Sequence, residues 1–229
     1  MIYSLLNIIF INIVAFGLAL LVTANLKFQN IYRAAFFVPN LIGGLVLGYI
    51  WQFIYNEALI QWFAPSLIAR GQTSMAGLII VVTWQYAGYI MMIYIAALQN
   101  VPQDLIEASK IDGANGIQRL RNIVFPMIAQ AFTIAMFLTL VTSFKQFDTI
   151  VSLGNPAGGL PGFFGGIYNV NTGDITVQTL DLVAVNIYKE AFNRSNFGFG
   201  QAKAIIFFFA LLIISLLQVY YNKKKEIEL

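Results

Sequence analysis

The chain has 229 residues and contains neither cysteine nor histidine. The absence of cysteine excludes disulfides, thiolate metal sites and thiol catalysis, and the absence of histidine removes the commonest metal ligand and general base. Charged residues make up only 10% of the chain, against about 25% in soluble domains, and the mean hydropathy is +0.75. This composition indicates an integral membrane protein. The net charge of +3 is small, and nothing indicates nucleic-acid binding, which would require a clustered basic face.

Five charge-free runs are long enough to cross a bilayer, which requires about 20 apolar residues. They are Met1–Leu26, Ala34–Asn56, Gly71–Gln103, Asn122–Phe144 and Ala204–Asn222. We therefore predict an all-α membrane protein with five transmembrane helices. The first run could instead be a signal peptide, but it lacks a basic start and a small-residue cleavage site. A sixth run, Thr149–Gly173, holds seven Gly and two Pro, and such irregular backbone cannot face lipid.

The lysines and arginines divide unequally between the two sides of the predicted spans. One side would hold Lys27, Arg33, Lys110, Arg119, Arg121, Lys223, Lys224 and Lys225. The other side would hold Arg70, Lys145, Lys189, Arg194 and Lys203. Because cytoplasmic loops carry an excess of Lys and Arg, we expect the first side, with its C-terminal lysines, to be cytoplasmic. This places the N-terminus outside and the C-terminus inside.

Residues 1–229 are predicted to form a single membrane domain without soluble modules. Its longest extracytoplasmic connection covers residues 146–203, whose first half is loop by composition. The second half, "LDLVAVNIYKEAFNR", fits a helix with Leu180, Val183, Ile187 and Ala191 near one face. We interpret it as an interfacial helix lying on the bilayer. A lid or docking surface for an external partner is the alternative.

Residues 102–126 form a compact charged stretch between two predicted spans. Pro102 is well placed to start a helix, Gly113 can adopt the left-handed conformation that ends it, and Asn115 can cap a second helix. This pattern predicts two helices joined by a bend at the cytoplasmic surface. The first helix is partly apolar and cannot bury that surface alone, which suggests docking into a groove of another protein. A solvated connector that only sets topology is the alternative.

The same stretch resembles the cytoplasmic EAA loop of permease subunits in bacterial binding-protein-dependent ABC importers. That pattern is Glu-Ala-Ala, three residues, Gly, nine residues, Ile, one residue and Leu-Pro. This chain has Glu107-Ala108-Ser109, then Gly113, Ile123 and Phe125-Pro126 at the same spacing. Ser109 replaces the second Ala and Phe125 replaces Leu, while Asp112-Gly113-Ala114 is similar to the Asp-Gly-Ala core of the family.

Three further segments resemble carbohydrate-type permeases of the maltose-type family. They are "YRAAFFVPNLIGGLVLGYIWQFIYN", "TWQYAGYIMMIYIAALQNVPQDLIEA" and "IYKEAFNRSNFGFGQAKAI". Two departures stand out. The family has a core of six helices, of which the first is missing here, and its outer Gly-Gly-Pro motif reads Gly154-Asn155-Pro156. The resemblance therefore implies a type I ABC importer permease that lacks the first helix.

This resemblance implies a function in ATP-driven import of a sugar or oligosaccharide across the bacterial plasma membrane. The helix around Glu107 would be a coupling helix, with Glu107, Ala108, Ser109, Asp112 and Gly113 at the contact with a cytoplasmic ATPase dimer. A second homologous permease subunit would complete the path, and an extracytoplasmic solute-binding protein would deliver the solute. The chain has no Gly-x-x-x-x-Gly-Lys-Ser/Thr loop. ATP and Mg are therefore expected on the partner, and no catalytic residue, metal or cofactor is expected on this chain.

Polar residues in two predicted spans mark a candidate solute path. Thr139, Thr142, Ser143 and Gln146 lie at i, i+3, i+4 and i+7, which is one helical face, and Gln85 and Tyr89 are four residues apart. Polar groups in a span face protein or water rather than lipid. The alternative to a sugar site is hydrogen bonding between helices. Counted from the EAA loop, all of these positions except Gln85 align with substrate-lining positions of the maltose-type permease.

Three other function classes remain open at this point. An ion-coupled secondary transporter or channel would normally bury ionisable residues inside its spans, and these spans contain none. An intramembrane enzyme would have to use carboxylates such as Asp148. A non-transporting membrane subunit is the third class. The lack of Arg or Lys inside the spans favours a neutral sugar over an anionic solute.

Overall fold

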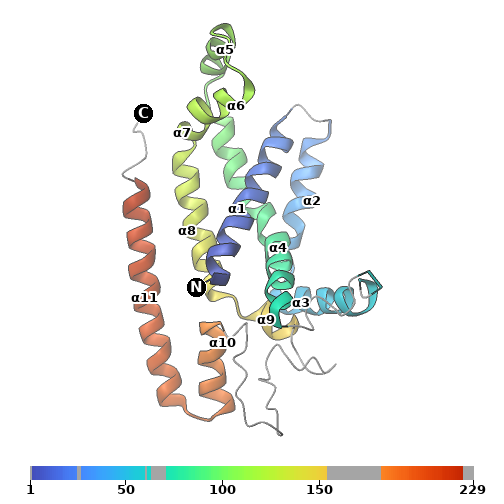
Figure 1. The fold of residues 1–229 in the computed structure, drawn as a ribbon, viewed down its shortest axis with the longest axis vertical. Helices are drawn as coiled ribbons and strands as arrows, with labels where there is room; N and C mark the ends of the chain where they lie inside the picture. Colours follow the sequence, from blue (N-terminus) through green and yellow to red (C-terminus); the bar gives the residue numbers. More distant parts are fainter. Residues whose placement is uncertain (1, 25–26, 60, 63–70, 154–181, 224–229) are drawn as a thin grey trace.

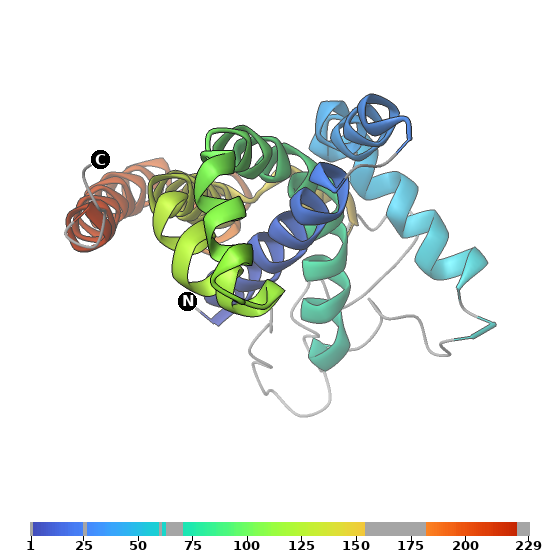
Figure 2. The ribbon, with the colours of Figure 1, turned by 90° about the horizontal axis from the view of Figure 1, so that it is seen from above.

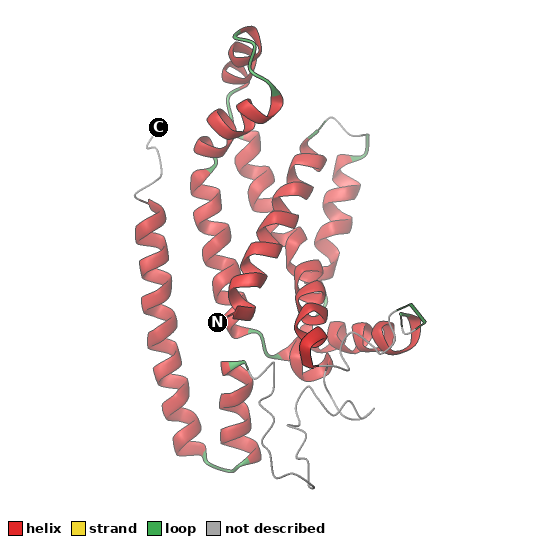
Figure 3. Cartoon of the chain, viewed as in Figure 1, coloured by secondary structure: helices red, strands yellow, loops and turns green. Residues whose placement is uncertain are grey.

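The computed structural model describes residues 2–24, 27–59, 61–62, 71–153 and 182–223. Within these ranges the secondary structure is entirely helical (Figure 3). Three helices are long and apolar enough to span a membrane: α1 (Ile2–Thr23), α4 (Gly71–Gln99) and α11 (Phe197–Lys223). Two bent helix pairs bring the possible number of spans to five, which agrees with the five predicted from the sequence.

The first bent pair covers the region of the transmembrane helix predicted over Ala34–Asn56. It consists of α2 (Gln29–Leu41) and α3 (Gly44–Phe53), which η1 (Ile54–Ala58), a π-helix, extends. The two parts meet at 98°. The break follows from the backbone, because Ile42 is extended with φ −78° and ψ 126°, and Gly43 has φ −59° and ψ 140°. Pro39, one turn earlier, lacks the N–H that a continuous helix requires.

The second bent pair lies between the charged stretch and the predicted span Asn122–Phe144. Helix α6 (Gly116–Arg119) continues into the π-helix η2 (Leu120–Val124) and α7 (Phe125–Met127). A bend of 72° then leads into α8 (Ala129–Lys145). Pro126 cannot donate a backbone hydrogen bond, and π-bulges and prolines are recognised causes of such bends. The part of the span after the bend, α8, therefore begins seven residues after the predicted start.

The bundle is built around α1, which packs along α4 and also contacts α8 (Figure 1). Two short helices, α9 (Asp148–Leu153) and α10 (Val183–Tyr188), follow α8. Helix α9 packs against α3, and α10 with the π-helix η4 (Lys189–Asn193) packs against α11. Viewed from above, α11 lies at one edge of the bundle and α3 extends at the opposite edge (Figure 2).

The core consists mainly of apolar side chains from α1, α4 and α8, with further residues from α3, η1, α9 and α10. Ile11, Ala15 and Ala19 on α1 are fully buried, as is Tyr94 on α4. By contrast, α11 contributes no core residue over its apolar window, so one whole helix exposes apolar surface. Phe208, Phe209 and Leu216 are each more than half exposed. This distribution fits a helix that faces lipid or another subunit, because water does not tolerate so large an apolar surface.

The basic residues divide between the two ends of the molecule as the sequence predicts. Helix α5 (Gln103–Ile111) stands at one end, and the C-terminal ends of α1 and α11 point toward the same end (Figure 1). The turn after α1 carries Lys27, and α5 carries Lys110. Lys145 and Lys203 lie toward the opposite end, on the far parts of α8 and α11. The two basic groups therefore lie at opposite ends.

Candidate functional site

The predicted EAA-like stretch folds as two helices that project from the end of the bundle (Figure 1). Pro102 occupies the N-cap of α5, with Asp104 in its first turn. The helix ends in a Schellman motif: the N–H of Ala114 donates to the Ser109 carbonyl at 2.9 Å, and that of Gly113 to the Lys110 carbonyl at 3.1 Å. Gly113 has φ +78°, a conformation that favours glycine. Asn115 and Gln118 form a capping box on α6.

The exposed surface of this unit includes both charged and apolar side chains. Glu107, Ala108 and Asp112 are exposed, whereas Ser109 is buried and donates to the Ile106 carbonyl at 2.7 Å. Ile111, one turn after Glu107, is 87% exposed, and Ile117 on α6 is 78% exposed. An exposed carboxylate one turn from an exposed isoleucine on the same short helix is a pattern that another protein's groove can accommodate. We call the unit formed by residues 103–119 the coupling loop, after the role that the resemblance to the EAA loop implies for it.

The predicted polar stripe on α8 divides into two parts in the structure. Thr139 and Ser143 are fully buried and accept hydrogen bonds from α1. Asn12 Nδ2 donates to Thr139 Oγ1 at 3.0 Å, and Asn7 Nδ2 donates to Ser143 Oγ at 2.8 Å. The hydroxyl of Tyr94 on α4 donates to Asn12 Oδ1 at 2.6 Å. These five residues, which we call the buried polar network, join α1, α4 and α8.

Thr142 and Gln146, the other part of the stripe, line a cavity of about 250 Å³. We call this cavity the polar pocket; its lining residues are Gly44, Gln85, Tyr86, Val141, Thr142, Lys145, Gln146, Phe147, Asp148 and Thr149. Gln85 and Gln146 are 4% and 6% exposed. The Thr142 hydroxyl donates to the Leu138 carbonyl at 2.9 Å. The pocket thus brings together three of the six residues predicted for the solute path.

Helix α3 fixes one wall of the polar pocket through glycines. A Cβ on Gly48 would lie 1.8 Å from Ser152 Oγ, and a Cβ on Gly44 would lie 3.0 Å from Asp148 Cβ. The missing side chains let α9 approach the backbone of α3, and Ser152 Oγ donates to the Gly44 carbonyl at 3.2 Å. This contact holds Asp148 and Thr149 in place at the pocket.

Tyr89, the sixth predicted residue, neither lines the polar pocket nor joins the buried polar network. It is half-buried and packs against the hydrophobic core. Sequence reasoning overlooked Asn7 and Asn12, although asparagines inside the first apolar run were a visible signal. It also left out Lys145 and Thr149, whose role depends on how α9 folds back against α3.

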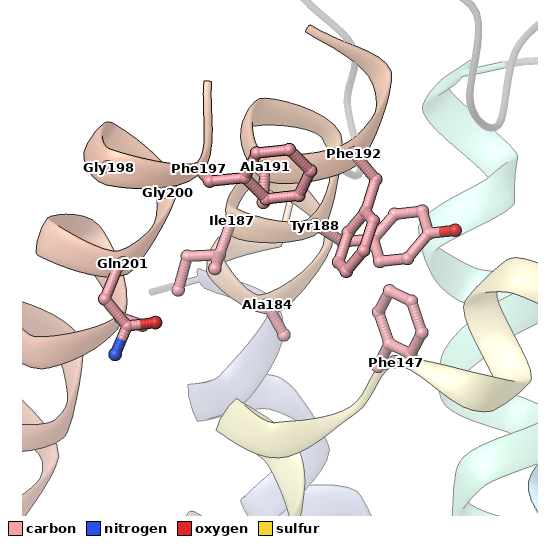
Figure 4. A pocket seen from close by; sticks show the side chains of 11 residues that line it. Phe147, Ala184, Ile187, Tyr188, Ala191, Phe192, Phe197, Gly198, Gly200 and Gln201 are labelled. Carbon is pink, nitrogen blue, oxygen red and sulfur yellow. The ribbon is translucent and has the colours of Figure 1, made fainter. Parts of the chain in front are cut away.

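The segment before the last helix forms a hairpin with α11 and encloses an apolar pocket (Figure 4). The cavity, about 690 Å³, is lined by aromatic residues that include Phe147, Tyr188, Phe192 and Phe197. Ile187 and Ala191 also face it, whereas Val183 is exposed. Leu180 lies outside the described residues, as does the Gly-rich loop. The predicted apolar face is therefore turned in part toward α11.

A buried carboxylate forms ion pairs that hold the two arms of this hairpin together. Glu190 Oε2 accepts from Lys203 Nζ at 2.9 Å and from Arg194 Nη1 at 3.0 Å, and Lys203 also donates to Asn186 Oδ1 at 2.9 Å. The hydrogen bond from Lys203 and the two positive charges hold the pKa of Glu190 below its ordinary value, although burial acts in the opposite direction. No group of three or more metal-binding side chains is present in the described part of the chain.

Comparison with known sequences and structures places these features in context. A sequence profile of the family described as "Binding-protein-dependent transport system inner membrane component" matches residues 11–227. A probable starch degradation products transport system permease protein of Thermoanaerobacterium thermosulfurigenes is 44% identical over 230 residues, with 97% of this chain and 72% of that protein covered. A multiple sugar-binding transport system permease protein of Streptococcus mutans is 26% identical, with 89% and 67% covered.

Solved structures show the same fold. A bacterial ABC transporter involved in the import of the acidic polysaccharide alginate contains a chain that superposes with a TM-score of 0.74 at 16% identity, with 97% of this chain and 79% of that chain covered. A second structure, of a bacterial alginate ABC transporter in complex with an alginate pentasaccharide-bound periplasmic protein, gives a TM-score of 0.72 at 17% identity, with 96% and 73% covered. At this identity the likeness concerns the fold alone.

Proposed function

The chain belongs to the family of inner membrane components of binding-protein-dependent transport systems, and we propose that it is one permease subunit of an ATP-driven sugar importer. It would form the translocation path with a second homologous permease in the plasma membrane, with its C-terminus in the cytoplasm. An external binding protein would deliver a neutral sugar or oligosaccharide. The names of two relatives support a sugar or oligosaccharide, since they are permeases for starch degradation products and for multiple sugars.

The observation that carries the proposal is the coupling loop. It stands at the end of the bundle opposite the polar pocket, and its exposed Glu107 lies one turn from an exposed isoleucine. A preformed helix pair with a charged and apolar tip can insert into a groove of a cytoplasmic ATPase dimer. ATP and Mg would be bound by that partner, and this chain would transmit the closure of the ATPase subunits to α4 and α8, which flank the loop.

The predicted path residues have different roles in this proposal. Gln85, Thr142 and Gln146 line the polar pocket and are available to a solute, whereas Thr139 and Ser143 hold α1 against α8. Tyr89, which is half-buried, packs α4 against the hydrophobic core. In this proposal, lipid, the second permease and the external partner contact the apolar surface of α11 and the hairpin of α10 and η4.

Reconstitution of the complex in proteoliposomes tests the proposal against an ion-coupled transporter. We expect uptake of labelled maltotriose that requires external binding protein and ATP on the cytoplasmic side. Uptake should persist when ionophores collapse the gradients of protons and sodium. Transport that stops with the ionophores and continues without ATP would contradict the proposal.

A further inference from the structure

We propose that a groove between α8 and α11 binds one acyl chain of an anionic phospholipid, and that the phosphate of this lipid lies at Lys145. The lipid would belong to the leaflet at the end of the bundle opposite the coupling loop. The inference goes beyond the proposed function, because it requires only that the chain is a membrane component, as its family is. It follows from the position, length, lining and charge of the groove.

The groove lies between two helices that touch near both of its ends. Helices α8 and α11 run side by side and in opposite directions (Figure 1). The rings of Phe144 and Phe207 lie 6.2 Å apart between centroids, and Asn222 Nδ2 lies 3.9 Å from Met136 Sδ. Between the same helices is a cavity of about 550 Å³ that opens on the surface of the bundle. We call it the α8–α11 groove.

The α8–α11 groove has the length of one leaflet. Its lining on α11 begins at Ala204 and ends at Leu216, and the twelve residues between these positions cover about 18 Å of an α-helix. Half of the ~30 Å hydrocarbon core of a bilayer is about 15 Å. Ala204 is also the first residue of the charge-free run of α11. The groove therefore begins at the edge of the membrane and ends near its middle.

The lining of the α8–α11 groove suits a flexible chain better than another helix. Phenylalanines and leucines supply most of it, among them Phe137, Phe208 and Leu212, whereas Ala204 and Ser215 are its small residues. Helices that pack against each other in membranes meet through small residues, which let their backbones approach closely. Bulky side chains keep a partner helix away and leave a hollow between them. An acyl chain can fill such a hollow and supply the missing dispersion contacts.

A single charged side chain lines the α8–α11 groove, and it lies at the edge of the membrane. Lys145, which also borders the polar pocket, is the last residue of α8 and is exposed. Within the described ranges its ammonium group has no ion-pair partner, whereas Lys203, at the same end, is bonded to Glu190. Asp148 borders the polar pocket and not the groove. A lysine at a helix end extends toward the headgroups, where it can form a charge-assisted hydrogen bond with a lipid phosphate.

This charge favours an anionic lipid over one without net charge. Phosphatidylglycerol carries a net negative charge at its phosphate, whereas the choline group of phosphatidylcholine offsets that charge. The attraction between one lysine and anionic lipid corresponds to about fivefold in affinity. We therefore expect phosphatidylglycerol to bind about fivefold more tightly than phosphatidylcholine with the same acyl chains.

Photo-crosslinking in the intact importer complex tests the site. The complex in detergent micelles would be mixed with a phosphatidylglycerol that carries a diazirine in the middle of one acyl chain, illuminated, and digested for mass spectrometry. We expect adducts to concentrate on Leu211 and Leu212, which line the groove. Ile206 and Ile213 are exposed residues of α11 outside this lining, and they should carry severalfold fewer adducts. Unlabelled phosphatidylglycerol should displace the probe about fivefold more effectively than phosphatidylcholine.

Variants of the groove separate the contribution of its charge from that of its shape. Lys145→Gln should weaken displacement by phosphatidylglycerol about fivefold, to the level of phosphatidylcholine, whereas Lys145→Arg should keep the parent preference. Leu212→Trp fills the groove and should remove most adducts from Leu211. Leu217→Trp, at an exposed position of α11 outside the groove, is the matched control and should leave the adducts unchanged.

Other distributions of adducts would overturn the inference. Adducts spread evenly over the exposed residues of α11 would indicate an ordinary boundary lipid. Fewer adducts on Leu211 and Leu212 than on Ile206 and Ile213 would indicate that a helix of the second permease covers the groove. Equal displacement by the two lipids, or an unchanged preference in Lys145→Gln, would show that Lys145 does not hold the phosphate.

Discussion

The hydroxyl of Tyr94 on α4 donates a 2.6 Å hydrogen bond to Asn12 on α1. The same asparagine donates to Thr139 on α8 at 3.0 Å, so one amide joins three helices. Helix α4 leads into the coupling loop and α8 leads out of it. The network is therefore the direct polar link between α1 and the two helices that the ATPase would move.

We predict that Asn12→Leu destabilises the permease within the complex. The substitution removes two interhelical hydrogen bonds, each worth about 0.6 kcal/mol in a membrane protein, and leaves the Tyr94 hydroxyl unpaired. Thermal unfolding in detergent, followed by size-exclusion chromatography, should show a lower midpoint. Tyr94→Phe should cost less, because it removes only one interhelical hydrogen bond, although it leaves Asn12 Oδ1 without a donor. If Asn12→Leu had the same thermal midpoint as the parent, the buried polar network would not stabilise the fold.

A close helix contact gives a second prediction. Gly88 on α4 packs against the backbone of α2, where an added Cβ would lie 1.7 Å from the Phe36 carbonyl oxygen. Gly88→Ala must push the helices apart, and overpacking of this kind costs about 1–3 kcal/mol. We expect a lower thermal midpoint and a lower yield of assembled complex. Gly17→Ala on α1 is the control, because its Cβ would meet no atom within 4 Å, and it should behave like the parent. Equal behaviour of the two variants would contradict the packing.

The ion pair in the outer hairpin gives a prediction about pH. The pKa of Glu190 is lowered from 4.5, first by the hydrogen bond from Lys203. A carboxyl group with a lowered pKa contributes stability above its unfolded-state pKa and loses it as the pH falls through the folded-state value. The hairpin should therefore weaken when the pH drops below about 4.5.

Hydrogen exchange of the α10 and η4 amides from pH 6 down to about pH 3 would measure this effect, after correction for the intrinsic exchange rate. In Glu190→Gln, the same amides should exchange faster than in the parent at pH 6. They should lose no further protection on acidification. If the parent kept full protection at the lowest pH, Glu190 would not be a stabilising carboxylate. Glu57→Gln, in η1 and away from the hairpin, is a suitable control.

Local signals in the sequence predicted much of the coupling loop. Pro102, Gly113 and Asn115 occupy the cap, the left-handed residue and the capping box that their residue types favour. The number of spans followed from the charge-free runs. The 98° break between α2 and α3 did not, because Pro39 and Gly43 permit a kink but do not set its size, which depends on the packing of α3 against α9.

The neighbours of the polar stripe on α8 could not be predicted from the sequence. At about 100° per residue, Thr142 and Ser143 lie at the two edges of the stripe, about 100° apart. That width is enough to face two different neighbours, which are the polar pocket on one side and α1 on the other. Periodicity shows that such residues share a face, but only the tertiary structure shows which helix each edge meets.

The most direct test of the central claim is ATP-dependent maltotriose uptake, measured together with copurification of the ATPase, after changes in the coupling loop. Truncating one side of a buried charge pair costs about 2–5 kcal/mol, so Glu107→Ala should strongly reduce both quantities. Gly113→Pro should do the same, because proline cannot adopt φ +78°. Asp104→Asn on the same helix is the control and should remain close to the parent. Parent-level uptake and copurification in both Glu107→Ala and Gly113→Pro would contradict the account.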